Sequence, residues 1–234
     1  AALFAIAAPV APSVNAADDT LKSGNKNSLS ISGQVVRALY YADDGLNEKL
    51  FQGDGGITAT RVRWVAKGTV NENVTMGATL ELNSPLSNSQ ASLKLHAGAA
   101  GAGSTDSATS TTWGVRHQFV WVNHKRMGKI SLGQTNAASN GRSETTFSGV
   151  NMAADSGGVV AGRGLQWINT TNAQVSLSAL TIGSVFTNQD GRSRTDVLRY
   201  DTPRFSGLAL AASAIAGGSW DVGADYRWKD GPIK

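Results

Sequence analysis

Charged side chains at alternate positions are the chemistry that this sequence offers most clearly. Five basic residues stand on the polar side of alternating segments: Arg61, Arg63, Lys67, Arg116 and Arg199. Two acidic residues, Glu144 and Asp155, stand in the polar stretch 135–162. If the two sets face each other across water, they set up a transverse field that aligns dipolar solutes and separates cations from anions. The alternative is a solvated strand face beside an external flap.

Other chemistries have weaker support in the sequence. The three histidines, His96, His117 and His124, do not combine with carboxylates at metal-ligand spacing, and the chain has no cysteine. The glycine-rich run 98–105 lacks the lysine of a phosphate loop, and the Asp-Gly turns near 43 and 54 lack the third ligand of a calcium loop. We therefore expect no catalytic residue, no cofactor and no metal.

The composition favours many strands joined by turns. The 234 residues include 27 glycines and five prolines, and 41% are hydrophobic whereas 16% are charged. Lys and Arg outnumber Asp and Glu by 21 to 17, a net charge of +4 that is too small for a disordered charged tail. The basic residues alternate with apolar ones instead of gathering beside exposed aromatics, which argues against nucleic acid as a partner.

The first 16 residues have the features of a leader peptide. They are uncharged and rich in alanine, and Val14-Asn15-Ala16 fits the small-x-small rule of a cleavage site. We expect residues 1–16 to be removed and residues 17–234 to be exported as one β domain. No transmembrane helix is expected: the longest uncharged stretch, 164–189, contains 13 Asn, Gln, Ser or Thr residues. A membrane would have to be crossed by strands.

Apolar and polar residues alternate with period two along most of the mature chain. In 220–228 every even position is apolar or aromatic. Segment 61–81 predicts a hairpin around the turn 71–73, with one apolar face and one basic face. In 113–121 the pattern predicts Phe119 and Trp121 on the apolar face. Further strands are expected at 29–41, 165–170, 175–186, 195–201 and 208–216.

Short turns alternate with long polar loops, which are expected at 43–56, 84–112 and 135–162. This asymmetry, with strands of about ten residues, is typical of outer-membrane barrels. Aromatic residues near strand ends suit interfacial girdles: Trp113, Trp121, Trp167, Tyr200, Phe205, Trp220, Tyr226 and Trp228. The alternative is a secreted or surface β-sandwich that binds carbohydrate or protein and packs its apolar faces together.

Three segments resemble the general porins of Gram-negative outer membranes. LSISGQVVRALYYADDG at 29–45 resembles their opening strand. RHQFV at 116–120 with GKISLGQ at 128–134 resembles the strands before the constriction loop. LRYDTP at 198–203 with FSGL at 205–208 is similar to a later hairpin. The resemblance implies an all-β, antiparallel up-and-down transmembrane barrel, trimeric and water-filled, that is no enzyme and passes small hydrophilic solutes and ions passively.

The same resemblance implies that 135–162 folds inward as the constriction loop, so that Glu144 and Asp155 face the basic wall. The partners it implies are outer-membrane lipid, lipopolysaccharide and further copies of the chain. Members of the family usually have 16 strands and an aromatic last residue, whereas this chain ends in Lys234. We expect about 10 to 12 strands here, either as a C-terminally incomplete part of a 16-stranded barrel or as a smaller barrel.

Overall fold

Antiparallel strands make up most of the part of the chain that the computed structural model describes. The described residues are 8–9, 21–23, 26–54, 59–84, 95, 112–142, 164–169, 176–185 and 190–228. Within these ranges the single helix is α2 (Ile182–Val185). No helix in the described part of the chain has the length and apolar character needed to cross a bilayer.

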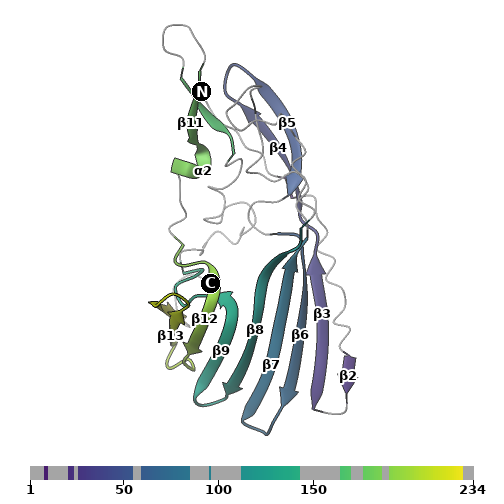
Figure 1. Ribbon diagram of the computed structural model, residues 1–234, viewed down its shortest axis with the longest axis vertical. Helices are drawn as coiled ribbons and strands as arrows, with labels where there is room; N and C mark the ends of the chain where they lie inside the picture. Colours follow the sequence, from purple (N-terminus) through teal and green to yellow (C-terminus); the bar gives the residue numbers. More distant parts are fainter. Residues whose placement is uncertain are drawn as a thin grey trace.

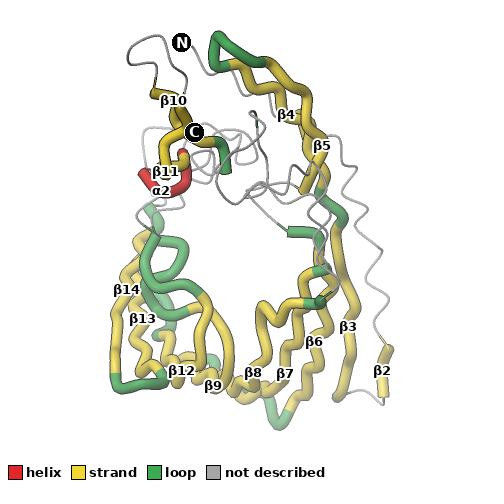
Figure 2. Tube along the Cα trace, turned by 45° about the horizontal axis from the view of Figure 1, so that its top comes forward, coloured by secondary structure: helices red, strands yellow, loops and turns green. Residues whose placement is uncertain are grey.

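The main sheet contains nine strands and is antiparallel throughout. From one edge to the other they are β2 (Leu21–Ser23), β3 (Asn27–Gln34), β6 (Arg61–Thr69), β7 (Val74–Asn83), β8 (Gly114–His124), β9 (Gly128–Asn136), β12 (Arg194–Asp201), β13 (Leu208–Ile215) and β14 (Ser219–Tyr226). Figure 1 shows the strands side by side, and Figure 2 shows that the sheet curves strongly. Its edges, β2 and β14, are not paired with each other among the described residues.

The β6–β7 and β8–β9 turns, which we call the short turns, lie at one end of the main sheet. Two smaller sheets lie beyond its other end (Figure 1). One joins β1 (Ala8–Pro9), β4 (Arg37–Asp43) and β5 (Glu48–Asp54). The other joins β10 (Gln166–Asn169) and β11 (Ser176–Thr181). Tyr40, Ala42 and Phe51 of the β4–β5 hairpin form a buried cluster with Leu165, so this hairpin has a small core of its own.

The β4–β5 hairpin corrects two expectations from the sequence. The strand predicted at 29–41 is two strands, and the loop predicted at 43–56 contains β5. The alternation breaks at two successive valines, Val35 and Val36, of which the first is exposed and the second buried. After this break β4 leaves the main sheet and pairs with β5. The segment predicted as a strand at 175–186 also ends early, at Thr181, where α2 begins.

The apolar face of the main sheet is the exposed face. Val222 and Tyr226 keep 61% and 62% of their surface, whereas Ser131 and Ser213 on the opposite face keep 3% each. In a β-sandwich the apolar faces would cover each other and the polar faces would be open. The observed burial is the reverse, as in a sheet whose apolar side meets hydrocarbon and whose polar side is turned inward.

Strand β8 departs from the predicted alternation because of a β-bulge. Glu81 of β7 pairs with His117, but the next residue, Leu82, pairs with Val115, so Arg116 is an extra residue. The bulge shifts the faces of the strand: Phe119 and Trp121 pair with Thr79 and Gly77 on the polar side. The prediction that these two aromatic residues belong to the apolar face was wrong.

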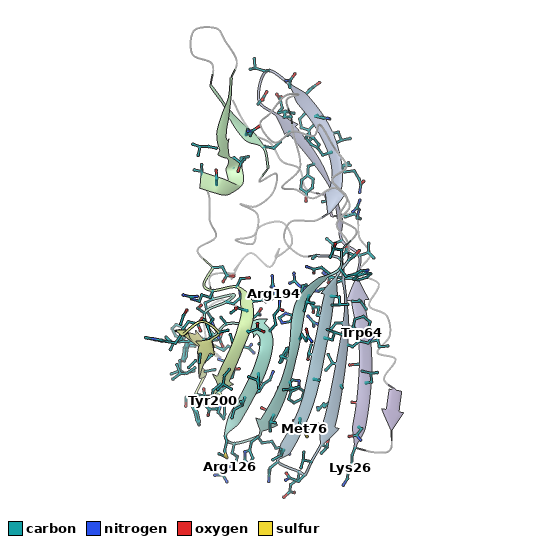
Figure 3. All side chains as sticks on the ribbon, in the orientation of Figure 1. Lys26, Trp64, Met76, Arg126, Arg194 and Tyr200 are labelled. Carbon is teal, nitrogen blue, oxygen red and sulfur yellow. The ribbon has the colours of Figure 1, made fainter. Side chains whose placement is uncertain are left out.

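Aromatic side chains gather at two levels of the apolar face. Tyr200, Phe205 and Tyr226 are exposed near the short turns, where Tyr200 Oη donates to the carbonyl oxygen of Met127 at the β8–β9 turn. Trp113 and Trp220 are exposed near the other end. Figure 3 shows Arg126 and Lys26 at the short-turn end and Arg194 near the opposite end. Two aromatic levels are what interfacial girdles require.

Candidate functional site

The β6–β7 hairpin positions the first basic residues of the predicted site. The antiparallel register pairs Arg63 with Glu81 and Arg61 with Asn83, which places both arginines on the polar face with Glu81 between β6 and β8. The hairpin predicted at 61–81 is confirmed, with its turn between Thr69 and Val74.

Glu81 is fully buried, and three guanidinium groups neutralise it. Arg63 Nε donates to Oε2, and Arg116 Nε donates to Oε1 at 2.7 Å. Arg61 Nη1 lies 3.4 Å from Oε1. The arginine side chains keep 16–41% of their surface whereas Glu81 keeps none, so the carboxylate forms the base of the cluster and the guanidiniums its exposed surface. We call these four residues, Arg61, Arg63, Glu81 and Arg116, the arginine cluster.

The bulge in β8 brings the third arginine into this cluster. A residue inserted into one strand lets two successive side chains turn toward the same face. Arg116 and His117 are both partly buried. Arg116 contacts Glu81, and His117 Nδ1 lies 3.1 Å from Thr135 Oγ1. Without the extra residue, strict alternation would point one of the two toward the apolar side.

The stretch that follows β9 crosses the polar face of β13 and β14. Ala138 N donates to Ser213 Oγ at 2.9 Å, and Ser139 donates from both N (2.9 Å) and Oγ (2.6 Å) to Asp221 Oδ2. A Cβ added to Gly223 would lie 2.2 Å from the carbonyl oxygen of Ala138, so this glycine leaves the space that the crossing segment occupies. The predicted loop 135–162 thus begins on the polar side of the sheet.

Arg199 anchors the same stretch from β12. Its Nη1 donates to the carbonyl oxygens of Asn136 and Ala137 at 3.0 and 3.1 Å. Its Nε donates to Asp201 Oδ2 at 3.0 Å, and its Nη2 donates to Asp201 Oδ1 at 2.6 Å. The predicted site residue therefore lies on the polar face as expected, but its donors are used to hold the chain in place.

Of the other predicted site residues, Lys67 lies apart from the arginine cluster. Lys67 is exposed on β6, four residue pairs closer to the β6–β7 turn than Arg63, opposite Ser28 and Gly77. Glu144 and Asp155 lie outside the described residues. In the described ranges no group of three or more His, Asp or Glu side chains gathers closely enough to hold a metal ion.

Comparison with known protein families decides what kind of sheet this is. A family model described as Gram-negative porin matches residues 2–233, nearly the whole chain. The chain belongs to the Gram-negative porin family. Porins of this family are outer-membrane diffusion channels and not enzymes, so the apolar face of this porin meets lipid and its polar face lines the channel. A search of curated proteins found no match.

Two residues that organise the polar face of the porin were missed by reasoning from sequence. Alternation alone shows Glu81 only as the last residue of the predicted hairpin, although a turn centred on 71–73 places it opposite Arg63 and could have revealed it. In the sequence Asp221 is one of several polar residues of 220–228, and no local signal relates it to Ser139, which lies 82 residues away.

Proposed function

We propose that this porin forms a passive, water-filled channel for small hydrophilic solutes and ions, with a filter built on the arginine cluster. The observation that carries the proposal is the buried Glu81 beneath three partly exposed guanidiniums. Three positive charges against one negative charge leave a surplus of two on this part of the channel wall. Such a surplus attracts anions into the narrowed water column and repels cations.

The inward course of loop 135–162 is the second part of the proposal. Its first residues cross the channel side of β13 and β14 and are bound there by Asp221 and Ser213. A loop that starts on the inner face narrows the channel at the height of the arginine cluster, because Thr135 in β9 is bonded to His117 beside that cluster. In this arrangement Glu144 and Asp155 supply the acidic side of a transverse field.

The assembled channel is a closed barrel, which we propose to occur as a homotrimer surrounded by outer-membrane lipid and lipopolysaccharide. Unpaired backbone groups in hydrocarbon cost several kcal/mol each, about as much as a lost hydrogen bond in an apolar solvent. The edges of β2 and β14, which have no outer neighbour among the described residues, therefore need pairing in the membrane, either with each other or with further strands. The trimer follows from the likeness to general porins described above.

Reconstitution in planar bilayers tests the proposal. We expect stepwise conductance in KCl and, under a KCl gradient, a reversal potential on the anion-selective side. Replacing the pair Arg61→Gln and Arg63→Gln removes two positive charges from the wall and should shift the reversal potential toward cation selectivity. Arg126→Gln, in the exposed β8–β9 turn, is the matched control and should leave the reversal potential unchanged.

Failure of the proposed channel and failure of the proposed filter would give different results. A protein that inserts into no bilayer and stays a soluble monomer would reject the channel itself. A channel that conducts, yet has the same reversal potential with and without Arg61 and Arg63, would remove the arginine cluster from the filter.

A further inference from the structure

A recess of about 440 Å³ lies in the channel wall between the arginine cluster and the short turns. Its residues come from five strands and include Arg63 at one end and Lys129 and Asp201 at the other. The recess also contains Phe119, a side chain whose ring would normally face lipid in a porin strand. An aromatic ring on the water side of a channel wall therefore calls for an explanation.

Glycines in the wall make room for Trp121 and Phe119. A Cβ added to Gly77 would lie 2.6 Å from Trp121 Cζ2, so the indole lies across Gly77. Gly133, with φ of 122°, lies against the base of the Phe119 side chain: an added Cβ would lie 3.2 Å from the Phe119 Cβ. Aromatic side chains that cover strand glycines are held in place by the wall itself. The rings offer solutes a fixed apolar surface.

Lys129 supplies a positive charge over both rings. Its Nζ lies 5.4 Å from the centroid of Phe119 and 5.3 Å from that of Trp121, within the range of cation–π attraction. The residue paired with Lys129 across the ladder is Asp201, whose two oxygens accept from Arg199. Within the described residues, Lys129 has no carboxylate within 4.0 Å. Its ammonium is therefore placed to receive an anion from the channel.

We propose that this recess, together with the Trp121 ring that adjoins it at Lys129, is a subsite for small aromatic carboxylates, whose carboxylate binds Lys129 and whose ring packs against Phe119 and Trp121. The inference rests on the proposed function, because the ligand reaches the recess through the open channel. The recess shares Arg63 with the arginine cluster but differs from it in chemistry: Glu81 does not line the recess, and Lys129 stands there beside aromatic rings. A small anion without a ring would bind Lys129 but would gain no contact with the aromatic rings.

Current blockade in planar bilayers tests the subsite, with sodium benzoate as the aromatic probe and sodium acetate as the matched anion without a ring. In the wild-type porin the concentration of benzoate that halves the KCl conductance should be about three to tenfold lower than that of acetate, the range expected for one aromatic contact. Phe119→Leu should bring the two concentrations together by weakening benzoate alone. Lys129→Gln should weaken both anions.

A turn residue serves as the control. Lys125→Gln, which removes an exposed positive charge from the β8–β9 turn, should change neither anion. Equal blockade by benzoate and acetate in a wild-type channel with normal KCl conductance would overturn the subsite and leave the channel standing. Absence of KCl conductance would overturn the channel and the subsite together. If Phe119→Leu does not insert, the wild-type comparison and Lys129→Gln still decide the question.

Discussion

Arg116 donates to Glu81 at 2.7 Å although the residue paired with Glu81 across the β7–β8 ladder is His117. The β-bulge explains the contact, because the extra residue in β8 turns two successive side chains toward the channel. Glu81 thereby gains a guanidinium from β8 in addition to the two from β6. A single inserted residue converts a charge pair on one hairpin into a cluster that spans three strands.

The charge of Glu81 limits the anion preference of the wall. Glu81→Gln leaves three guanidiniums without their counter-charge, so the reversal potential should move further to the anion-selective side. Removing one partner of a buried ionic group is also costly, so the free energy of unfolding should fall by about 3 kcal/mol. Bilayer recordings and urea titration in detergent measure the two effects.

Glu72→Gln provides the comparison for this variant. Glu72 is exposed in the β6–β7 turn, so its replacement should alter neither selectivity nor stability. If Glu81→Gln behaved like Glu72→Gln in both measurements, the carboxylate could not be the base of the arginine cluster.

Asp221 should control how firmly the start of loop 135–162 is held. Asp221→Asn replaces a carboxylate that accepts from the amide and hydroxyl of Ser139 by a neutral amide, and bonds to charged groups are the stronger ones. We expect the Ser139 amide to exchange with solvent deuterium about tenfold faster. Hydrogen exchange with mass spectrometry on the peptide 137–142 measures this rate, and Asp196→Asn, on an exposed side chain, is the control.

Gly77 should tolerate no side chain. Gly77→Val places atoms where Trp121 and the carbonyl oxygen of Ala66 already lie, so the variant should lose about 1–3 kcal/mol of stability and show altered tryptophan fluorescence. The neighbouring change Ala78→Val creates the same side chain by adding two methyl groups on the exposed lipid side and should be nearly neutral. Equal stability of both variants would mean that the indole does not lie across Gly77.

Tyr41 gives the porin a titration that can be followed above pH 10. Its hydroxyl donates to Glu48 Oε2 at 2.6 Å, and this hydrogen bond, reinforced by desolvation and the negative charges of Glu48 and Asp43, raises the pKa of Tyr41 to about 12. The neutral phenol is the bonded form, so the contribution to folding is complete below pH 10 and is lost as the pH rises toward 12.

Absorbance titration of the tyrosines measures this shift. The difference between the wild type and Tyr41→Phe isolates Tyr41 from the other three tyrosines. In Glu48→Gln the pKa of Tyr41 should return toward the ordinary value of about 10. A Tyr41 that titrates near pH 10 in the wild type would contradict the hydrogen bond.

Period-two patterning was sufficient to predict the sheet and its two faces, because one face must be apolar along every strand that crosses a membrane. The β6–β7 hairpin and the strands near 195–201 and 208–216 follow from it. The same patterning failed at β8, because a bulge adds one residue without changing the composition of the strand. Phe119 and Trp121 were therefore placed on the wrong face.

The site was predictable in its charges and not in its contacts. Arg61, Arg63 and Arg116 are predicted as wall residues from their alternation, and the structure brings them together on Glu81. The anchoring of Ala138 and Ser139 on Ser213 and Asp221 joins residues that are 75 and 82 positions apart. Alternation within a strand carries no information on which distant loop crosses its inner face. These anchoring contacts could be found only in the three-dimensional structure.

The β4–β5 hairpin has its own buried base, formed by Tyr40, Phe51 and Leu165, and its tip is closed locally by Asp44 Oδ1, which accepts from the amides of Leu46 and Asn47. Neither feature draws on the strands that line the channel. Substitutions at the hairpin tip are therefore expected to leave the arginine cluster and the contacts of Ala138 and Ser139 in place. The two ends of the chain's β structure can change sequence independently of each other.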